Sequence, residues 1–200
     1  VENAVYNALN RNVPIGGTSA GLAVLGDYDF TASTGKTVYS ADALLNPYDA
    51  AITLDGNNTT DGFLTPRDDS LAGASNARNL LGILSNTITD SHIRQRDRLG
   101  RLVTFMARLD ADDLIKQNGT NTANVRGIGI NEQTALLIEP SGSWTVVGNN
   151  STSSTDLPRS VYFMQHSIAT GSTTLQSPLR SEEHTSELQS RVDISYAVFC

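Results

Sequence analysis

Cysteine and long apolar runs are the two features that this sequence most clearly lacks. Cys200 is the only cysteine among 200 residues and stands in the last position, so no internal disulfide is expected. No apolar run approaches the ~20 residues that a membrane-spanning helix needs, so we expect no membrane partner. The length is sufficient for one domain with a hydrophobic core.

Basic charge and metal-ligating side chains are scarce too. The formal net charge is −7, which argues against nucleic acid as the main partner because phosphate binding needs a basic surface. His92 and His166 lie far apart in the sequence and no cysteine is near either, so no metal-ligand spacing is present. We therefore expect neither a metal nor another cofactor.

The two ends of the chain do not read like the ends of a natural domain. Residues 1–12, VENAVYNALNRN, read as a helix already under way, which predicts that a part with further strands precedes them. Arg180–Ser190, RSEEHTSELQS, resembles the translation of a sequencing-library adapter; the alternative is a capped surface helix. We therefore expect 1–179 to be a partial, N-terminally truncated domain and 180–200 to be a non-native tail that does not contribute to the fold.

The first part of the chain predicts an α/β fold. A helix up to residue 12, a short strand at 13–17 and a helix from about Ser19 follow one another. Residues 26–80 then contain much glycine, asparagine, aspartate and proline, which indicates a long loop-rich excursion. Such an excursion is usually functional or decorative rather than part of the core.

The second part continues the alternation of strands and helices. We expect a strand within 80–92, a helix from 99 to about 115 with apolar residues at helical spacing, and a strand within 125–132. Residues 134–149 predict a hairpin that turns at PSGS. A last strand is expected within 160–168.

The stretch GGTSAG places Ser19 in a G-x-S-x-G pattern between the predicted strand and helix. A serine on such a turn needs strained backbone angles, which small neighbours permit, and its hydroxyl is exposed. The first free N–H groups of the helix point to the same place, and the N–H of Ala20 is the candidate oxyanion donor. The pattern alone does not separate a nucleophile from a small residue in a glycine-rich loop.

A histidine followed by arginines marks the end of the second predicted strand. His92 is the candidate general base, because imidazole exchanges protons near neutral pH and open α/β sheets bind ligands at the carboxyl ends of their strands. As a cluster behind the histidine, the arginines favour carboxylate binding: Arg94, Arg96, Arg98 and Arg101. The alternatives are a structural histidine and ion pairs along the helix, such as Asp97 with Arg101.

Glu132 follows the third predicted strand, GIGI. A carboxylate there could accept the second imidazole N–H of His92 and fix its tautomer. The alternative is a solvated acid at a strand end.

Together, GGTSAG, DSHIRQRDRLGR and GIGINEQTAL resemble the cyanophycinase and peptidase E family of serine peptidases. The resemblance covers roughly residues 10–140. It implies a three-layer α/β/α sandwich with a mostly parallel sheet, related to class I glutamine amidotransferase domains. It also implies a Ser-His-Glu triad in which Ser19 is the nucleophile, His92 the base and Glu132 the orienting acid.

The resemblance further implies an exopeptidase that acts on cyanophycin, which is poly-aspartate with arginine on its side chains, or on related aspartyl peptides. Its substrate pocket corresponds to Asp90, Ser91, Arg96, Arg98 and Arg101. Ser91, Ile93 and Asn131 depart from the usual family residues, which affects substrate detail more than mechanism. The long insert before His92 resembles secreted members and favours a secreted or periplasmic location. The sequence does not decide between a monomer and a homodimer.

Two other interpretations remain. An α/β-hydrolase esterase also carries G-x-S-x-G, but it orders its triad serine, acid, histidine, so His166 would be the base. A non-catalytic amidotransferase-like domain would use the arginine cluster to bind an acidic ligand without cleaving it.

Overall fold

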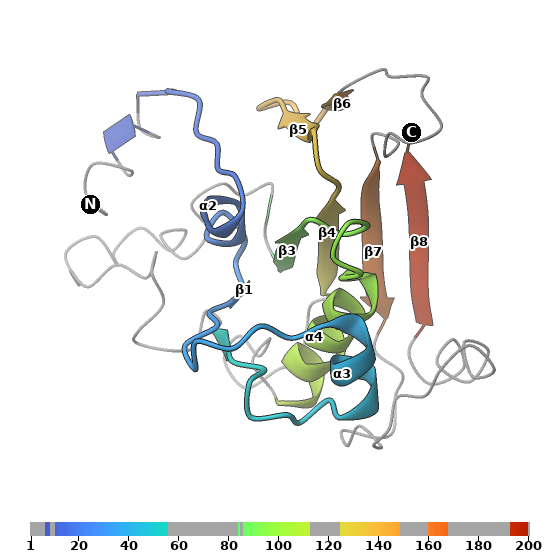
Figure 1. Cartoon of the computed structure of the whole chain (residues 1–200). Coiled ribbons are helices and arrows are strands. Elements are labelled where there is room, and N and C mark those ends of the chain that lie inside the picture. Colours follow the sequence, from blue (N-terminus) through green and yellow to red (C-terminus); the bar gives the residue numbers. More distant parts are fainter. Residues whose placement is uncertain are drawn as a thin grey trace.

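A computed structural model of the chain describes residues 7–8, 11–55, 84, 86–112, 125–148, 160–167 and 193–199. These residues form a mixed α/β structure in which a central sheet stands beside three helices (Figure 1). Residues 7–8 are helical and are the described part of the helix expected at the N-terminus. No helix in the described ranges is long and apolar enough to cross a membrane.

The central sheet has four strands in the order β3-β4-β7-β8. Strands β3 and β4 are parallel, and the chain between them contains a helix, as parallel neighbours require. Strand β7 runs antiparallel to β4, and β8 runs antiparallel to β7. The strands are β3 Thr87–Ser91, β4 Arg126–Ile130, β7 Val161–Ser167 and β8 Asp193–Phe199.

The described sheet is therefore mixed, with one parallel and two antiparallel pairs, whereas the family resemblance implied mostly parallel pairing. The difference arises because β7 folds back alongside β4 and β8 folds back alongside β7. Strand β8 lies within residues 180–200, for which no contribution to the fold was predicted, yet its backbone pairs with β7 along its whole length.

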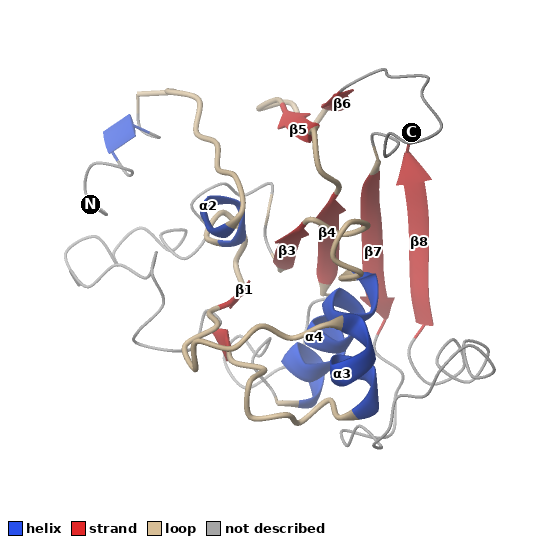
Figure 2. Ribbon diagram, in the orientation of Figure 1, coloured by secondary structure: helices blue, strands red, loops and turns tan. Residues whose placement is uncertain are grey.

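Helices α4 (Leu99–Ala111) and α3 (Ser40–Leu45) lie together on one side of the sheet (Figure 2). The apolar residues of α4 recur at helical spacing and are fully buried: Leu102, Phe105, Met106 and Leu109. A Cβ on Gly127 would lie 2.5 Å from the sulfur of Met106, so α4 packs directly on the backbone of β4. The helix predicted to reach about 115 ends at Ala111, and 113–124 lie outside the described residues.

Alternate residues of β4 face opposite sides of the sheet, as the pleat dictates. Gly127 and Gly129 face α4, whereas Ile128 and Ile130 pack in a second apolar cluster. That cluster includes Leu22 of α2 (Ala20–Ala23) and the inward residues of the hairpin. Apolar layers therefore cover both sides of β4.

The predicted hairpin is confirmed. Strand β5 (Thr134–Ile138) pairs antiparallel with β6 (Trp144–Gly148). The turn between them contains Gly142, whose φ of 83° explains the need for glycine there, and the Gly142 N–H donates to the Glu139 carbonyl.

The excursion over 26–80 contains ordered elements in its first half. Strand β1 (Asp29–Phe30) pairs antiparallel with β2 (Leu54–Asp55), and α3 lies between them in sequence. Residues 56–83 lie outside the described part of the chain. The strand predicted at 13–17 is not formed: the segment pairs with no described strand, and an extended chain without a neighbour gains no ladder hydrogen bonds.

Candidate active site

Ser19 occupies a sharp turn immediately before α2. Its φ of 54° and ψ of −121° lie in a region that residues with side chains rarely adopt. Gly17 permits the turn, because a Cβ there would lie 1.9 Å from the carbonyl oxygen of Gly21. Backbone strain of this kind costs ~1–3 kcal/mol and gathers at functional sites. The segment therefore has the backbone form of a nucleophile elbow.

The Ser19 hydroxyl is exposed and does not cap the helix that follows it. Accepting a backbone N–H is the common structural task of a serine at this position, so that explanation does not apply. The Gly21 N–H donates to the carbonyl of Thr18, whereas the Ala20 N–H has no acceptor among the described residues. The hydroxyl and the expected oxyanion donor are thus both available.

Helix α2 is attached to β3, the strand that leads to His92. The Thr89 hydroxyl donates to the carbonyl oxygen of Leu22 at 2.8 Å. Just beyond the helix, a Cβ on Gly26 would lie 2.6 Å from the carbonyl oxygen of Thr87. Figure 1 shows α2 beside β3 accordingly.

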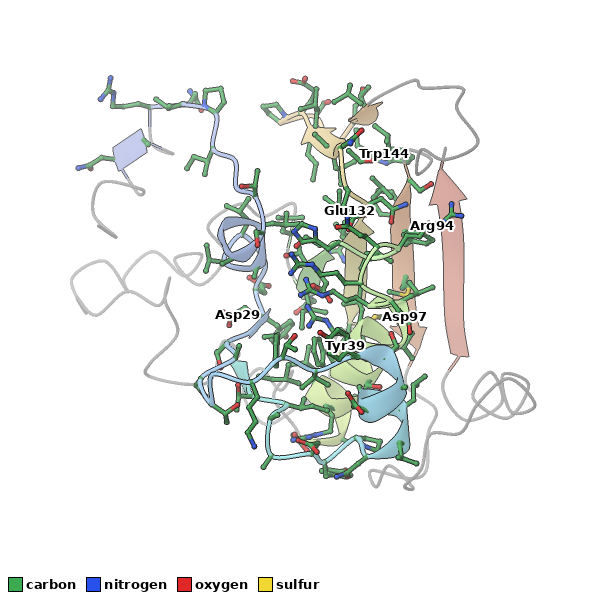
Figure 3. All side chains as sticks on the ribbon, viewed as in Figure 1. Asp29, Tyr39, Arg94, Asp97, Glu132 and Trp144 are labelled. Atoms are coloured by element: carbon green, nitrogen blue, oxygen red, sulfur yellow. The ribbon has the colours of Figure 1, made fainter. Side chains whose placement is uncertain are left out.

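His92 and Glu132 meet at one edge of the sheet. His92 directly follows β3, and Glu132 lies two residues beyond the end of β4. Since these strands are parallel, with Ser91 opposite Ile130, both end at the same edge. Nδ1 of His92 lies 3.2 Å from Oε1 of Glu132, and the side chains are 27% and 13% exposed. Figure 3 shows Glu132 at this end of β4.

The contact between His92 and Glu132 is close, but it is not aligned as a hydrogen bond. Nδ1 and both carboxylate oxygens are buried and have no hydrogen-bond partner among the described residues. The two atoms are already at hydrogen-bond distance, so a small side-chain rotation would align them. We assign the imidazole proton to Nδ1 from this contact, which leaves Nε2 as a hydrogen-bond acceptor.

The backbone of His92 is itself constrained. Its φ is 57°, in the left-handed region. The Arg96 N–H donates to the His92 carbonyl at 3.1 Å and the Arg98 N–H to the Ile93 carbonyl at 2.8 Å, and these two bonds close the turn of residues 92–98. Asn131 joins this turn to β4, because its Oδ1 accepts the Arg94 N–H at 3.2 Å. The imidazole therefore projects from a turn that is tied to the strand before Glu132.

The structure shows no hydrogen bond between the Ser19 hydroxyl and the His92 imidazole, two groups that lie within the described ranges. Catalytic hydrogen bonds are often long in ligand-free enzymes and tighten in the substrate complex. The structure thus brings His92 and Glu132 within 3.2 Å of each other, and Leu22, three residues after Ser19, bonds to the strand that precedes His92.

Arg101 is buried and bonded to oxygens of the protein itself. Its Nε and Nη2 donate to the two carboxylate oxygens of Asp90, each at 2.7 Å, and its Nη1 donates to the Val38 carbonyl at 3.0 Å. The guanidinium carbon also lies 5.2 Å from the ring centroid of Phe30 and 5.6 Å from that of Phe105. Arg101 and Asp90 are only 4% and 8% exposed.

Asp90 and Arg101 are thus buried and bonded to protein groups, and the expectation that they contact substrate stays a prediction. The alternative ion pair between Asp97 and Arg101 is not formed. Asp97 precedes the first residue of α4, so the i,i+4 geometry of a helix does not apply to it.

Arg98 differs from Arg101 because it has a spare donor. Its Nη1 donates to the Ser91 carbonyl at 3.1 Å, while its Nε is buried and has no partner within the described residues. Burial, and then the charge of Arg101, lower the pKa of Arg98, and Asp90 opposes the shift; an arginine nevertheless stays protonated. Ser91 is half-buried and Arg96 is exposed. An anion at this edge would give the Arg98 Nε an acceptor.

The backbone of His166 lies at the opposite end of the sheet. Strand β7 runs antiparallel to β4, with Val161 opposite Ile130 and Gln165 opposite Arg126. Glu132 follows Ile130, so the sheet edge at Glu132 is the edge at which β7 begins with Val161. His166 is five residue steps along the strand from Val161, which corresponds to about 17 Å.

Comparisons with protein-family models, with curated proteins and with solved structures find no match to this chain. Within the described residues, no group of three or more His, Cys, Asp or Glu side chains could hold a metal ion. The three sequence motifs and the geometry of the sheet edge therefore carry the functional argument.

Two contributors to the site were not predicted. Asn131 was noted only as a departure from a family pattern, yet its side chain bonds the histidine turn. Its position at the end of a buried strand was the available signal, because a buried amide needs partners. Val38 and Phe30, which surround Arg101, precede it by more than sixty residues, and no local pattern connects them.

Proposed function

We propose that this protein is a serine peptidase of the cyanophycinase and peptidase E type, with Ser19, His92 and Glu132 as its triad. The 3.2 Å contact between His92 and Glu132 carries the proposal, since it occurs at the sheet edge next to the strand that holds α2. The strained backbone of Ser19 supports it independently, because its φ and ψ are those that an elbow requires.

The proposal includes a three-layer α/β/α sandwich. Helices α3 and α4 on one side of the sheet, and α2 with the β5–β6 hairpin on the other, support this arrangement. Open sheets of this kind bind ligands at the carboxyl ends of their strands, where Ser91 and Ile130 end β3 and β4.

In the first half of the reaction, Nε2 of His92 takes the proton of the Ser19 hydroxyl as the oxygen attacks the peptide carbonyl. Glu132 stabilises the imidazolium that forms, and the Ala20 N–H donates to the developing oxyanion. His92 then gives its proton to the leaving amine, so the acyl group stays on Ser19.

In the second half, His92 takes a proton from water, and the resulting hydroxide attacks the acyl carbonyl. The tetrahedral intermediate collapses and releases the carboxylic acid, and His92 returns the proton to Ser19. Glu132 remains ionised throughout, because its task is to hold the imidazole and its charge.

An aspartyl peptide or cyanophycin is the proposed substrate class. The partly buried guanidinium of Arg98 and the exposed side chain of Arg96 follow His92 in the chain, and guanidinium groups recognise carboxylates. A charge-assisted hydrogen bond contributes about 1.5–3 kcal/mol, so one such contact discriminates strongly between aspartyl and neutral substrates.

The esterase interpretation with His166 as base is less well supported. The backbone of His166 lies at the far end of β7 from the Glu132 edge, while His92 follows the strand bonded to α2. The non-catalytic interpretation keeps the arginines but gives no task to the strained backbone at Ser19.

Labelling with a neutral fluorophosphonate probe, followed by peptide mapping, tests the proposal. We expect the label on Ser19, no label in Ser19→Ala, strong loss in His92→Ala and normal labelling in His166→Ala. Ser141→Ala, which changes an exposed serine on the hairpin turn, is the matched control. Loss in His166→Ala but not in His92→Ala would favour the esterase. An unlabelled protein that still binds acidic peptides would favour the binding domain.

A further inference from the structure

We infer that Asp90 and Arg101 form a positioning pair that fixes the backbone of Ser91, and through it the imidazole of His92. The inference rests on the proposed function, because it gives His92 a catalytic task. In this role, neither Asp90 nor Arg101 contacts the substrate.

The pair holds the residue that precedes His92. Oδ1 of Asp90 accepts the Ser91 N–H at 2.8 Å as well as the Nη2 of Arg101 at 2.7 Å. The Ser91 carbonyl accepts Nη1 of Arg98 at 3.1 Å. Both backbone polar groups of Ser91 are thus bonded to side chains, and the next residue is the strained His92.

Arg101 holds Asp90 in one orientation because each of the three guanidinium nitrogens donates a hydrogen bond to the protein. Two parallel N–H donors fit the two carboxylate oxygens, which is the geometry that makes such pairs directional. The remaining nitrogen, Nη1, donates to the Val38 carbonyl, and the rings of Phe30 and Phe105 lie near the guanidinium. A lysine has one point charge and no fork, so it cannot hold Asp90 in the same way.

The orientation of Asp90 matters for catalysis because the His92 imidazole must align with two partners at once. A misplacement of ~1 Å at a catalytic group can cost ~10²-fold in rate. If the Asp90 carboxylate turns, the Ser91 N–H loses its acceptor, and the turn that begins at His92 loses its support on the β3 side.

Arg101→Lys compared with Arg108→Lys tests the inference. Arg108 is the matched control, because it lies on the same helix and forms its own ion pair with Asp112 through Nε at 2.8 Å. We expect Arg101→Lys to slow labelling of Ser19 by a neutral fluorophosphonate, and to lower kcat on an aspartyl peptide, by the same ~10–100-fold, with KM little changed. Arg108→Lys should leave both rates within about twofold of the parent. Normal labelling with a raised KM for the aspartyl peptide would overturn the inference, because it is the result expected if Arg101 held substrate.

Amide hydrogen exchange gives a second measurement that does not depend on activity. The Ser91 N–H should exchange slowly in the unchanged chain and at least ~10-fold faster in Asp90→Asn, with a shifted His92 imidazole resonance. Fast exchange in the unchanged chain overturns the inference even if the variants fail to fold. A chain that neither labels nor hydrolyses, but shows this exchange pattern, would refute the peptidase and still support the positioning pair.

Discussion

Glu132→Gln is the most informative single substitution, because it removes a charge and keeps the size of the side chain. At 3.2 Å and an effective dielectric constant near 20, a carboxylate stabilises an imidazolium by about 5 kcal/mol. His92 is 27% exposed, so solvent screens part of this energy, and we expect a loss of about 3–4 kcal/mol in the transition state. Since 1.36 kcal/mol corresponds to tenfold in rate, the expected fall is about 10²–10³-fold.

The rate of fluorophosphonate labelling at Ser19, measured with kcat on an aspartyl peptide, is the assay for Glu132→Gln. Both should fall together, because the lost interaction appears only when His92 is protonated. Glu139→Gln, which changes an exposed acid next to the hairpin turn, is the control and should leave both rates unchanged. A Glu132→Gln protein that retains its native circular dichroism spectrum and labels within about threefold of the parent rate would refute the assignment of Glu132.

Three further predictions concern the elbow, the arginine cluster and the core. Gly17→Ala should abolish labelling and lower the melting temperature, because the new Cβ would lie 1.9 Å from the Gly21 oxygen; an active, equally stable variant would contradict the elbow. Arg98→Ala should reduce turnover of an aspartyl peptide ~10-fold or more beyond its effect on a neutral ester, and equal losses on both would remove the proposed carboxylate contact. Burial, and then the charge of Asp27, raise the pKa of Tyr28 well above its ordinary value of 10.0. Since only the unfolded state then ionises above pH ~10, the free energy of unfolding should fall by ~1.4 kcal/mol per pH unit there, and Tyr28→Phe should remove this contribution in denaturant titrations.

The sequence was sufficient to predict the strand ends that carry the site. The strands before His92 and Glu132 and the apolar spacing of α4 are local patterns, and the structure confirms them. Their adjacency follows from one further step, because parallel neighbours joined by a helix end at the same edge of a sheet. The contact between His92 and Glu132 was therefore predictable in principle.

The partners of Arg101 were not predictable in the same way. Its bonds go to Asp90 and Val38, which come from other elements, and only the packing of those elements decides between them and Asp97. A pattern of arginines predicts that cations are close together, but not which of them is buried. In the structure, the guanidinium of Arg101 donates its hydrogen bonds to Asp90 and Val38. The Nε of Arg98, in contrast, has no hydrogen-bond partner within the described part of the chain.

The error in the strand prediction at residues 13–17 has a related cause. Residues 13–17 have the composition of a strand, but a strand forms only where a neighbour accepts its hydrogen bonds, and no described strand lies beside them. Strand β8 pairs with β7 in the segment predicted to be a non-native tail, and that prediction stays untested.

A crystal structure of the chain after reaction with a fluorophosphonate tests the central claim most directly. We predict the adduct on Oγ of Ser19, with Nε2 of His92 within ~2.6–3.2 Å of that oxygen and Nδ1 hydrogen-bonded to Glu132. An adduct on Ser19 with the His92 imidazole directed elsewhere, or an adduct on another serine, would contradict it.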